Sequence, residues 1–167
     1  VSSSGAHQLH TSTCRGVEEG SHKSIAEIGG YLYYKARGGF VRFDGSSATE
    51  ISEEISGGDY RLAIAGREGE KYVASCEGAS GEQFVFVYDT RYRTWQRESS
   101  ELIRSDNRLT ALEEQDGRLI FVIGHHAYYH DHRDGDVYVH GVTEEHVRYM
   151  YESGDIGFSD MEKKYIC

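Results

Sequence analysis

The sequence predicts an all-β fold, and three observations support that prediction. Tyr and Gly are abundant, at 13 and 20 of the 167 residues, and together they favour strands joined by tight turns. Apolar and aromatic runs of roughly four to seven residues, the usual strand length, recur between Gly and Asp-Gly pairs. No stretch of about ten residues keeps the three-four apolar spacing of a helix.

The expected strands follow one another from residue 24 to residue 152. Runs such as 84–88 and 137–139 alternate their side chains as half-buried strands do. The predicted strands are 24–28, 31–36, 40–43, 60–65, 71–76, 83–88, 94–97, 109–113, 118–123, 127–130, 137–140 and 147–152. Residues 99–106 are expected to form a helical turn.

Pairs of small or acidic residues separate many of these runs. They supply the positive φ angles that hairpin turns require. The separators are Gly29-Gly30, Gly38-Gly39, Asp44-Gly45, Asp116-Gly117 and Asp134-Gly135. Neighbouring strands are therefore expected to pair antiparallel through short hairpins.

The runs also form a unit that repeats along the chain. In each unit a second run ends at an aspartate, and Asp44, Asp89 and Asp131 are spaced 45 and 42 residues apart. A period in the forties with about four short strands per unit is typical of β-propeller blades. Each blade is an antiparallel four-stranded sheet that must stack on neighbours to bury its faces. Trp95 follows Asp89 at the place where kelch-like blades have an aromatic residue. The alternative fold is an antiparallel sandwich or barrel without blade symmetry.

The repeat divides the chain into five expected parts. These are an irregular leading segment (1–22), three blades (about 23–57, 58–104 and 105–146), and a strand that leads to a following domain (147–167). Closed propellers carry about four to eight blades, so the predicted ring is partial. Because the chain begins with Val and ends at Cys167 in an expected strand, we expect it to be cut from a longer polypeptide at both ends.

Charge and cysteine content exclude several classes of function. With 18 basic and 28 acidic residues the net charge is −10, which disfavours binding to nucleic acid or to an anionic membrane surface. No apolar run approaches the roughly 18 residues of a membrane span, and no secretory leader opens the chain. Three scattered cysteines, Cys14, Cys76 and Cys167, are too few for a disulfide framework and favour a reducing compartment.

Several segments, in their order along the chain, resemble a known family. They are 14–16 (CRG), 21–25 (SHKSI), 32–40 (LYYKARGGF), 43–45 (FDG), 87–91 (VYDTR), 94–95 (TW), 152–157 (ESGDIG) and 163–166 (KKYI). This order is similar to large structural proteins of tailed phages and prophages of gut Firmicutes, described as minor structural or tail-associated virion proteins with a propeller-like β region. Relatives carry a proline near 46–48 and near 160–162, where this sequence has none.

The resemblance implies a structural and interaction module of a virion, in the tail or head-tail region, without catalysis and without a cofactor. The expected partners are other virion proteins or sister subunits, and the expected location is the virion, assembled in the bacterial cytoplasm. A propeller at the tail tip that binds a host-surface carbohydrate or receptor is one alternative. A metal-dependent propeller hydrolase or lyase is another.

A histidine-rich segment is the candidate metal site. His125, His126, His130 and His132 lie close to Asp131, and imidazole and carboxylate groups are ligands for zinc and similar ions. If 127–130 is a strand, His126 and His130 share a face, and Asp131 or His132 could complete the site. The other interpretation is a solvated turn and hairpin, and we expect no metal.

The candidate interaction site lies near the end of the second unit, at Tyr92, Arg93 and Trp95. Arginine and aromatic side chains are frequent in protein-binding hot spots, although an outer strand with stacked arginines gives the same pattern. The sequence contains no Gly-x-Ser-x-Gly motif and no cysteine with a histidine in a recognisable motif, so nucleophilic catalysis has no support. Cys76 is expected to be a core thiol.

Overall fold

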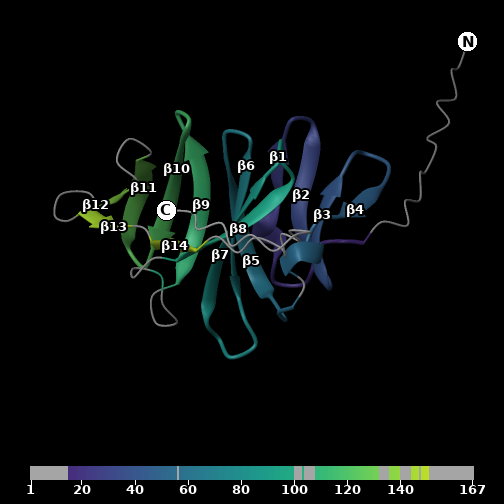
Figure 1. The fold of residues 1–167 in the computed structure, drawn as a ribbon, viewed down its shortest axis with the longest axis horizontal. Coiled ribbons are helices and arrows are strands. Elements are labelled where there is room, and N and C mark those ends of the chain that lie inside the picture. Colours follow the sequence, from purple (N-terminus) through teal and green to yellow (C-terminus); the bar gives the residue numbers. More distant parts are fainter. Residues whose placement is uncertain are drawn as a thin grey trace, which may run out of the picture.

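The computed structural model describes residues 15–55, 57–99, 103, 108–131, 136–139, 144–146 and 148–150. These residues form an all-β structure of three antiparallel sheets (Figure 1), which confirms the predicted fold class. The described helical residues are two short 3-10 turns, η1 (His22–Ser24) and η2 (Glu53–Ile55). No helix in these residues is long and apolar enough to cross a membrane.

The first sheet is an antiparallel meander in the order β1-β2-β3-β4. Its strands are β1 (Ala26–Ile28), β2 (Tyr31–Ala36), β3 (Gly39–Phe43) and β4 (Ala48–Glu50). The residues before β1 continue along the same edge, because Val17 forms an isolated bridge with Ala36 and the amide of Glu18 donates to the carbonyl of Lys35 over 3.0 Å. This part of the expected irregular leading segment is therefore attached to the sheet.

The second and third sheets repeat this meander, and each gains one more strand. The second is ordered β14-β8-β7-β6-β5 and the third β13-β12-β11-β10-β9. The second comprises β5 (Arg61–Glu68), β6 (Lys71–Glu77), β7 (Gln83–Asp89), β8 (Thr94–Ser99) and β14 (Arg148–Met150). The third comprises β9 (Leu109–Gln115), β10 (Arg118–Ile123), β11 (His126–Asp131), β12 (Asp136–Val139) and β13 (Glu144–His146).

The first and third hairpins have the same loop length in all three sheets, whereas the second hairpin is longer in sheet 2, where Glu77 pairs with Gln83. The first hairpin of each sheet closes across a two-residue loop, with the flanking pairs Ile28↔Tyr31, Glu68↔Lys71 and Gln115↔Arg118. The third hairpin closes across a four-residue loop, with the flanking pairs Phe43↔Ala48, Asp89↔Thr94 and Asp131↔Asp136. The periodic aspartates thus lie at the end of the third strand of each sheet, or directly after it.

Positive φ angles at the two-residue loops explain their sequence. Gly29 and Gly30 have φ of 60° and 83°, and Asp116 and Gly117 have φ of 52° and 75°. Both residues of a type I′ turn require positive φ, which glycine adopts without strain and aspartate tolerates. The separators at these two places therefore form the turns that the sequence predicts.

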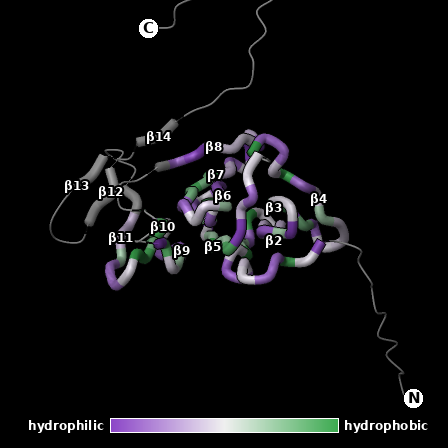
Figure 2. The backbone as a smooth tube through the Cα atoms, turned by 90° about the horizontal axis from the view of Figure 1, so that it is seen from below, coloured by the Kyte–Doolittle hydropathy of each residue, from purple (hydrophilic) through white to green (hydrophobic). Residues whose placement is uncertain are grey.

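The three sheets lie side by side, as Figures 1 and 2 show from two directions, and two layers of buried side chains hold them together. We call the face of a sheet that points toward the next sheet in sequence its front face, and the opposite face its back face. The layer between sheets 1 and 2 is mostly aromatic; its largest members are Tyr33, Phe40, Tyr72, Phe86, Tyr88 and Trp95. The layer between sheets 2 and 3 is mostly aliphatic; its members include Val73, Val85, Val87, Leu112, Leu119, Phe121 and Tyr128.

The close approach of sheets 2 and 3 depends on Gly66 in β5. A Cβ atom at this position would lie 3.1 Å from Cβ of Leu112 and 3.2 Å from the backbone carbonyl carbon of the same residue. Contacts this short are rare, so a side chain at this position would require Leu112 in β9 to shift by a few tenths of an ångström. The absence of a side chain at Gly66 therefore allows β5 and β9 to pack closely.

The strand predictions and the structure differ at two short elements. β4 and β13 have no counterpart among the predicted runs, because Ala48–Glu50 and Glu144–His146 are short and mostly polar. The strands up to β13 span 26–50, 61–99 and 109–146, whereas β14 (Arg148–Met150) comes from the expected strand at 147–167 and pairs with β8 of the second sheet. The second and third sheets thus have five strands each, not the expected four. Most of the predicted helical turn at 99–106, and the segments 1–14 and 151–167, lie outside the described residues. The described residues form no closed ring.

Candidate functional site

The β7–β8 hairpin presents Tyr92 to solvent. The Asp89 carboxylate shapes the turn, because its Oδ1 accepts hydrogen bonds from the amides of Arg91 and Tyr92 over 2.9 and 3.1 Å. Tyr92 is 74% exposed, and the Arg91 guanidinium lies 5.8 Å from its ring centroid. Arg93 is also exposed and has φ of 59°. Tyr92 and Arg93 are thus at the surface, as the predicted interaction site requires.

Trp95, the third predicted interaction residue, lies in the core. Its side chain is 7% exposed and lies in the aromatic layer between sheets 1 and 2. The indole N–H donates to the carbonyl of Ile51 over 2.5 Å, and the ring centroid is 5.1 Å from that of Phe40 and 4.9 Å from that of Tyr88. Because Trp95 pairs with Tyr88 on the back face of sheet 2, its indole packs against sheet 1 and is not available to a partner.

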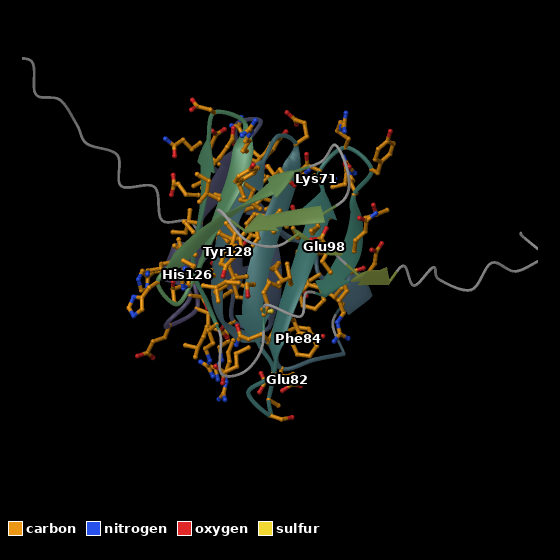
Figure 3. The ribbon with its side chains drawn as sticks, turned by 90° about the vertical axis from the view of Figure 1, so that its left-hand side faces the viewer. Lys71, Glu82, Phe84, Glu98, His126 and Tyr128 are labelled. Carbon is orange, nitrogen blue, oxygen red and sulfur yellow. The ribbon has the colours of Figure 1, made fainter. Side chains whose placement is uncertain are left out.

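The histidine-rich segment is described in part. His126 begins β11, is exposed, and has its ring centroid 6.4 Å from that of Tyr128; its imidazole points away from the strands in Figure 3. The backbone of His130 and Asp131 continues the same strand, whereas their side chains and His132 lie outside the described part. Among the side chains that the structure describes, no group of three or more ligands could hold a metal ion. The expectation that this segment holds no metal stays a prediction.

A buried polar cluster joins sheets 1 and 2, and the sequence patterns did not reveal it. It consists of Glu18, Ser21, Ser24 and Lys35. The Lys35 ammonium, whose side chain is 3% exposed, donates to Oε2 of Glu18 over 3.0 Å and to the carbonyl of Ala36 over 2.8 Å. Two donors of the ammonium are therefore satisfied inside the protein.

The two serines of the cluster connect the segment before β1 to sheet 2. Oγ of Ser21 accepts a hydrogen bond from the amide of Ala63 in β5 over 2.9 Å. The hydroxyl of Tyr72 in β6 donates to the carbonyl of Ser24 over 2.8 Å, and burial raises the pKa of Tyr72 far above its ordinary value. These contacts make the cluster a structural link and not an open site.

The Cys76 thiol is a core group. It is 1% exposed, and burial raises its pKa to about 12, although the nearby Lys35 ammonium acts in the opposite direction. A thiol with such a pKa stays protonated near neutral pH and is a poor nucleophile. Its environment therefore matches the expectation of a core thiol.

The front face of sheet 3, which points away from sheet 2, is an open surface of the described structure, on the side that Figure 3 turns toward the viewer. A hollow of about 490 Å³ lies at its β9–β10 end, and its lining residues are Gln115, Asp116, Arg118, Ile120 and Tyr129. The Arg118 guanidinium lies over the Tyr129 ring, 5.2 Å from its centroid. This face combines branched apolar, aromatic and cationic groups.

Equivalent positions on the other two sheets are covered. Counted from the first hairpin, Tyr33 in β2 and Val73 in β6 correspond to Ile120 in β10. Tyr33 and Val73 are buried by the following sheet, whereas Ile120 is only half-buried. In the third strands, Phe40 and Val85 are buried and the equivalent Ala127 is exposed. Within the part of the chain that the structure describes, the front face of sheet 3 therefore has the position of a packing surface without a following sheet.

Comparisons with known proteins identify no relative. No protein-family model matches the chain. No curated protein and no solved structure matches it either.

Proposed function

We propose that this chain is a segment of a β-propeller that acts as a structural and interaction module, without catalysis. The observation that carries the proposal is the equivalence of the three sheets. Each contains a meander of four consecutive antiparallel strands with the same loop lengths at its first and third hairpins. Each also buries one face against its neighbour, as blades of a radial array must.

The chemistry of the buried groups supports a structural role. The Lys35 ammonium is engaged by Glu18 and by a backbone carbonyl, and burial raises the pKa of the Cys76 thiol to about 12. Catalytic groups need substrate access and a pKa suited to proton transfer or attack. Both groups are buried away from any substrate and instead link or fill the space between sheets 1 and 2.

We place this module in the virion of a tailed phage or prophage, in the tail or head-tail region. The support is the ordered set of segments from 14 to 166 that resembles minor structural proteins of such particles. The partners are other virion proteins or sister subunits, which would contact the open sheet face and exposed hairpins such as that of Tyr92.

Particle composition tests this proposal. The reading frame is tagged in a lysogen, the prophage is induced, and particles purified by density gradient are analysed by mass spectrometry. The protein is expected at a fixed ratio to the tail or portal proteins. Its absence from intact particles, with normal expression in the lysate, would refute a virion role.

Binding of a host-surface carbohydrate is the second candidate function. The specific observation is Tyr92, which is 74% exposed beside the Arg91 guanidinium, because aromatic faces flanked by polar groups suit sugar rings. A glycan array with the wild-type protein and Tyr92→Ala separates this candidate from the first. Binding that disappears in the variant would favour it, and an array without hits at high protein concentration would exclude it.

A further inference from the structure

The two ends of the row of sheets carry surfaces of opposite kind. At one end, the front face of sheet 3 exposes or half-exposes Ile120, Val122 and Ala127. Equivalent front positions in sheets 1 and 2 are in contact with the back face of the next sheet. The surface expected to cover Ile120 is therefore the back face of another sheet of this type.

The other end of the row offers such a back face. Leu32 in β2 is 38% exposed, and Phe43 and Ala48 beside it are half-buried. Leu32 is equivalent to Tyr72 and Leu119, both of which are buried against the preceding sheet. The hairpin half of this back face is thus apolar and accessible.

Residues before β1 run beside the other half of this back face. The hydroxyl of Tyr34 donates to the carbonyl of Arg15 over 2.7 Å, and Arg15 forms an ion pair with Glu50 at 2.7 Å. Tyr34 and Val41 are buried here. The accessible apolar area is therefore concentrated around Leu32, near the β1–β2 hairpin.

Charges at the same end of the two faces are complementary. Arg118 is exposed on the front face of sheet 3, directly after the β9–β10 hairpin. Glu27 is exposed on the back face of sheet 1, where it pairs with Leu32 and precedes the β1–β2 hairpin. Arg67 in sheet 2 and Glu114 in sheet 3 both occupy the position that Glu27 has in sheet 1. They form an ion pair of 2.9 Å between sheets 2 and 3, so a charged side chain at this position can pair across a contact between sheets.

We infer that a second copy of this chain docks head to tail, with its sheet 1 back face around Leu32 packed on the sheet 3 front face around Ile120. The inference rests on the proposed propeller, since it uses the packing mode of sheets 1, 2 and 3. Such a contact is heterologous, and two copies joined through both contacts form a closed ring. With the three sheets that the described residues of each copy form, the ring would lie within the range of about four to eight blades.

The test measures the mass of the full chain by size exclusion with light scattering. Ile120→Glu places a charge on the front face of sheet 3, and Leu32→Glu places one on the back face of sheet 1. Both side chains are partly exposed, so the variants are expected to fold, which circular dichroism checks. Wild type is expected at twice the chain mass, and each variant at one chain mass. Ser80→Glu, in the exposed β6–β7 loop of the middle sheet and outside both faces, is the matched control and should remain dimeric.

Mixing the two variants gives the decisive result. Leu32→Glu keeps an intact front face and Ile120→Glu an intact back face, so an equimolar mixture should recover a one-to-one dimer. A monomeric wild type would overturn the inference, as would a Leu32→Glu variant that stays dimeric through two front faces. A mass above two copies would overturn the two-copy ring. Because the particle experiment scores presence in the virion, its result and this one can fail separately.

Discussion

Replacing Trp95 by Phe tests the assignment of this residue to the core. Phe keeps one aromatic ring but loses the N–H that donates to the Ile51 carbonyl over 2.5 Å. A buried carbonyl left without its donor costs about 1–3 kcal/mol. The smaller ring also loses contacts with Phe40 and Tyr88, at roughly 1 kcal/mol per methylene-sized group. We therefore expect a loss of about 2–4 kcal/mol in the free energy of unfolding.

Urea unfolding followed by far-UV circular dichroism measures this loss, because Trp95 is the one tryptophan of the chain and its fluorescence disappears in the variant. With a slope of about 2 kcal/mol per molar urea, the midpoint falls by about 1–2 M. Tyr92→Phe, on the exposed hairpin, is the control and should stay within about 0.5 kcal/mol. A Trp95→Phe variant with the urea midpoint of the wild type, beside a Tyr92→Phe variant with a lowered midpoint, would refute the buried placement of Trp95.

Three further variants or conditions test the layers between the sheets. Gly66→Ala should destabilise the protein by about 1–3 kcal/mol, because its Cβ would crowd Leu112; Gly16→Ala, with no atom within 4 Å, is the control, and equal melting temperatures would contradict the role of Gly66. Lys35→Met should cost about 2–4 kcal/mol in urea unfolding by leaving the partly buried Glu18 carboxylate without its cation; an unchanged midpoint would show that the pair is not formed. The free energy of unfolding should fall as pH rises from about 9 toward 12. Burial raises the pKa of Cys76 from 9.0 to about 12, so the unfolded chain releases the thiol proton at lower pH than the folded chain. In Cys76→Ala the decline should be shallower, and a free energy of unfolding that rises with pH would contradict the burial.

Strands and turns could be predicted because local composition determines them. β2 and β10 coincide with predicted runs, and Gly29-Gly30 and Asp116-Gly117 form the two-residue turns that their φ preferences favour. β4 could not be predicted from its own residues. It is a short polar edge strand that exists because Phe43, Arg42 and Val41 offer it a pairing partner.

The location of individual side chains was less predictable, because it depends on which sheet faces which. Trp95 follows a surface hairpin, so the nearby arginines and Tyr92 suggested an interaction site. Its register with Tyr88 instead turns it inward. Lys35 gave no signal of burial either, since its partner Glu18 is 17 positions away and belongs to a segment without a regular pattern.

The meander topology has a consequence for how the chain acquires its structure. From β1 to β13, almost every strand pairs with the strand next to it in sequence. Each sheet can therefore form from its own hairpins while later residues are still being synthesised. Short loops of this kind carry a small closure entropy and favour rapid folding. β14 is the exception: its partner β8 precedes it by a whole sheet, and we expect this strand to join last.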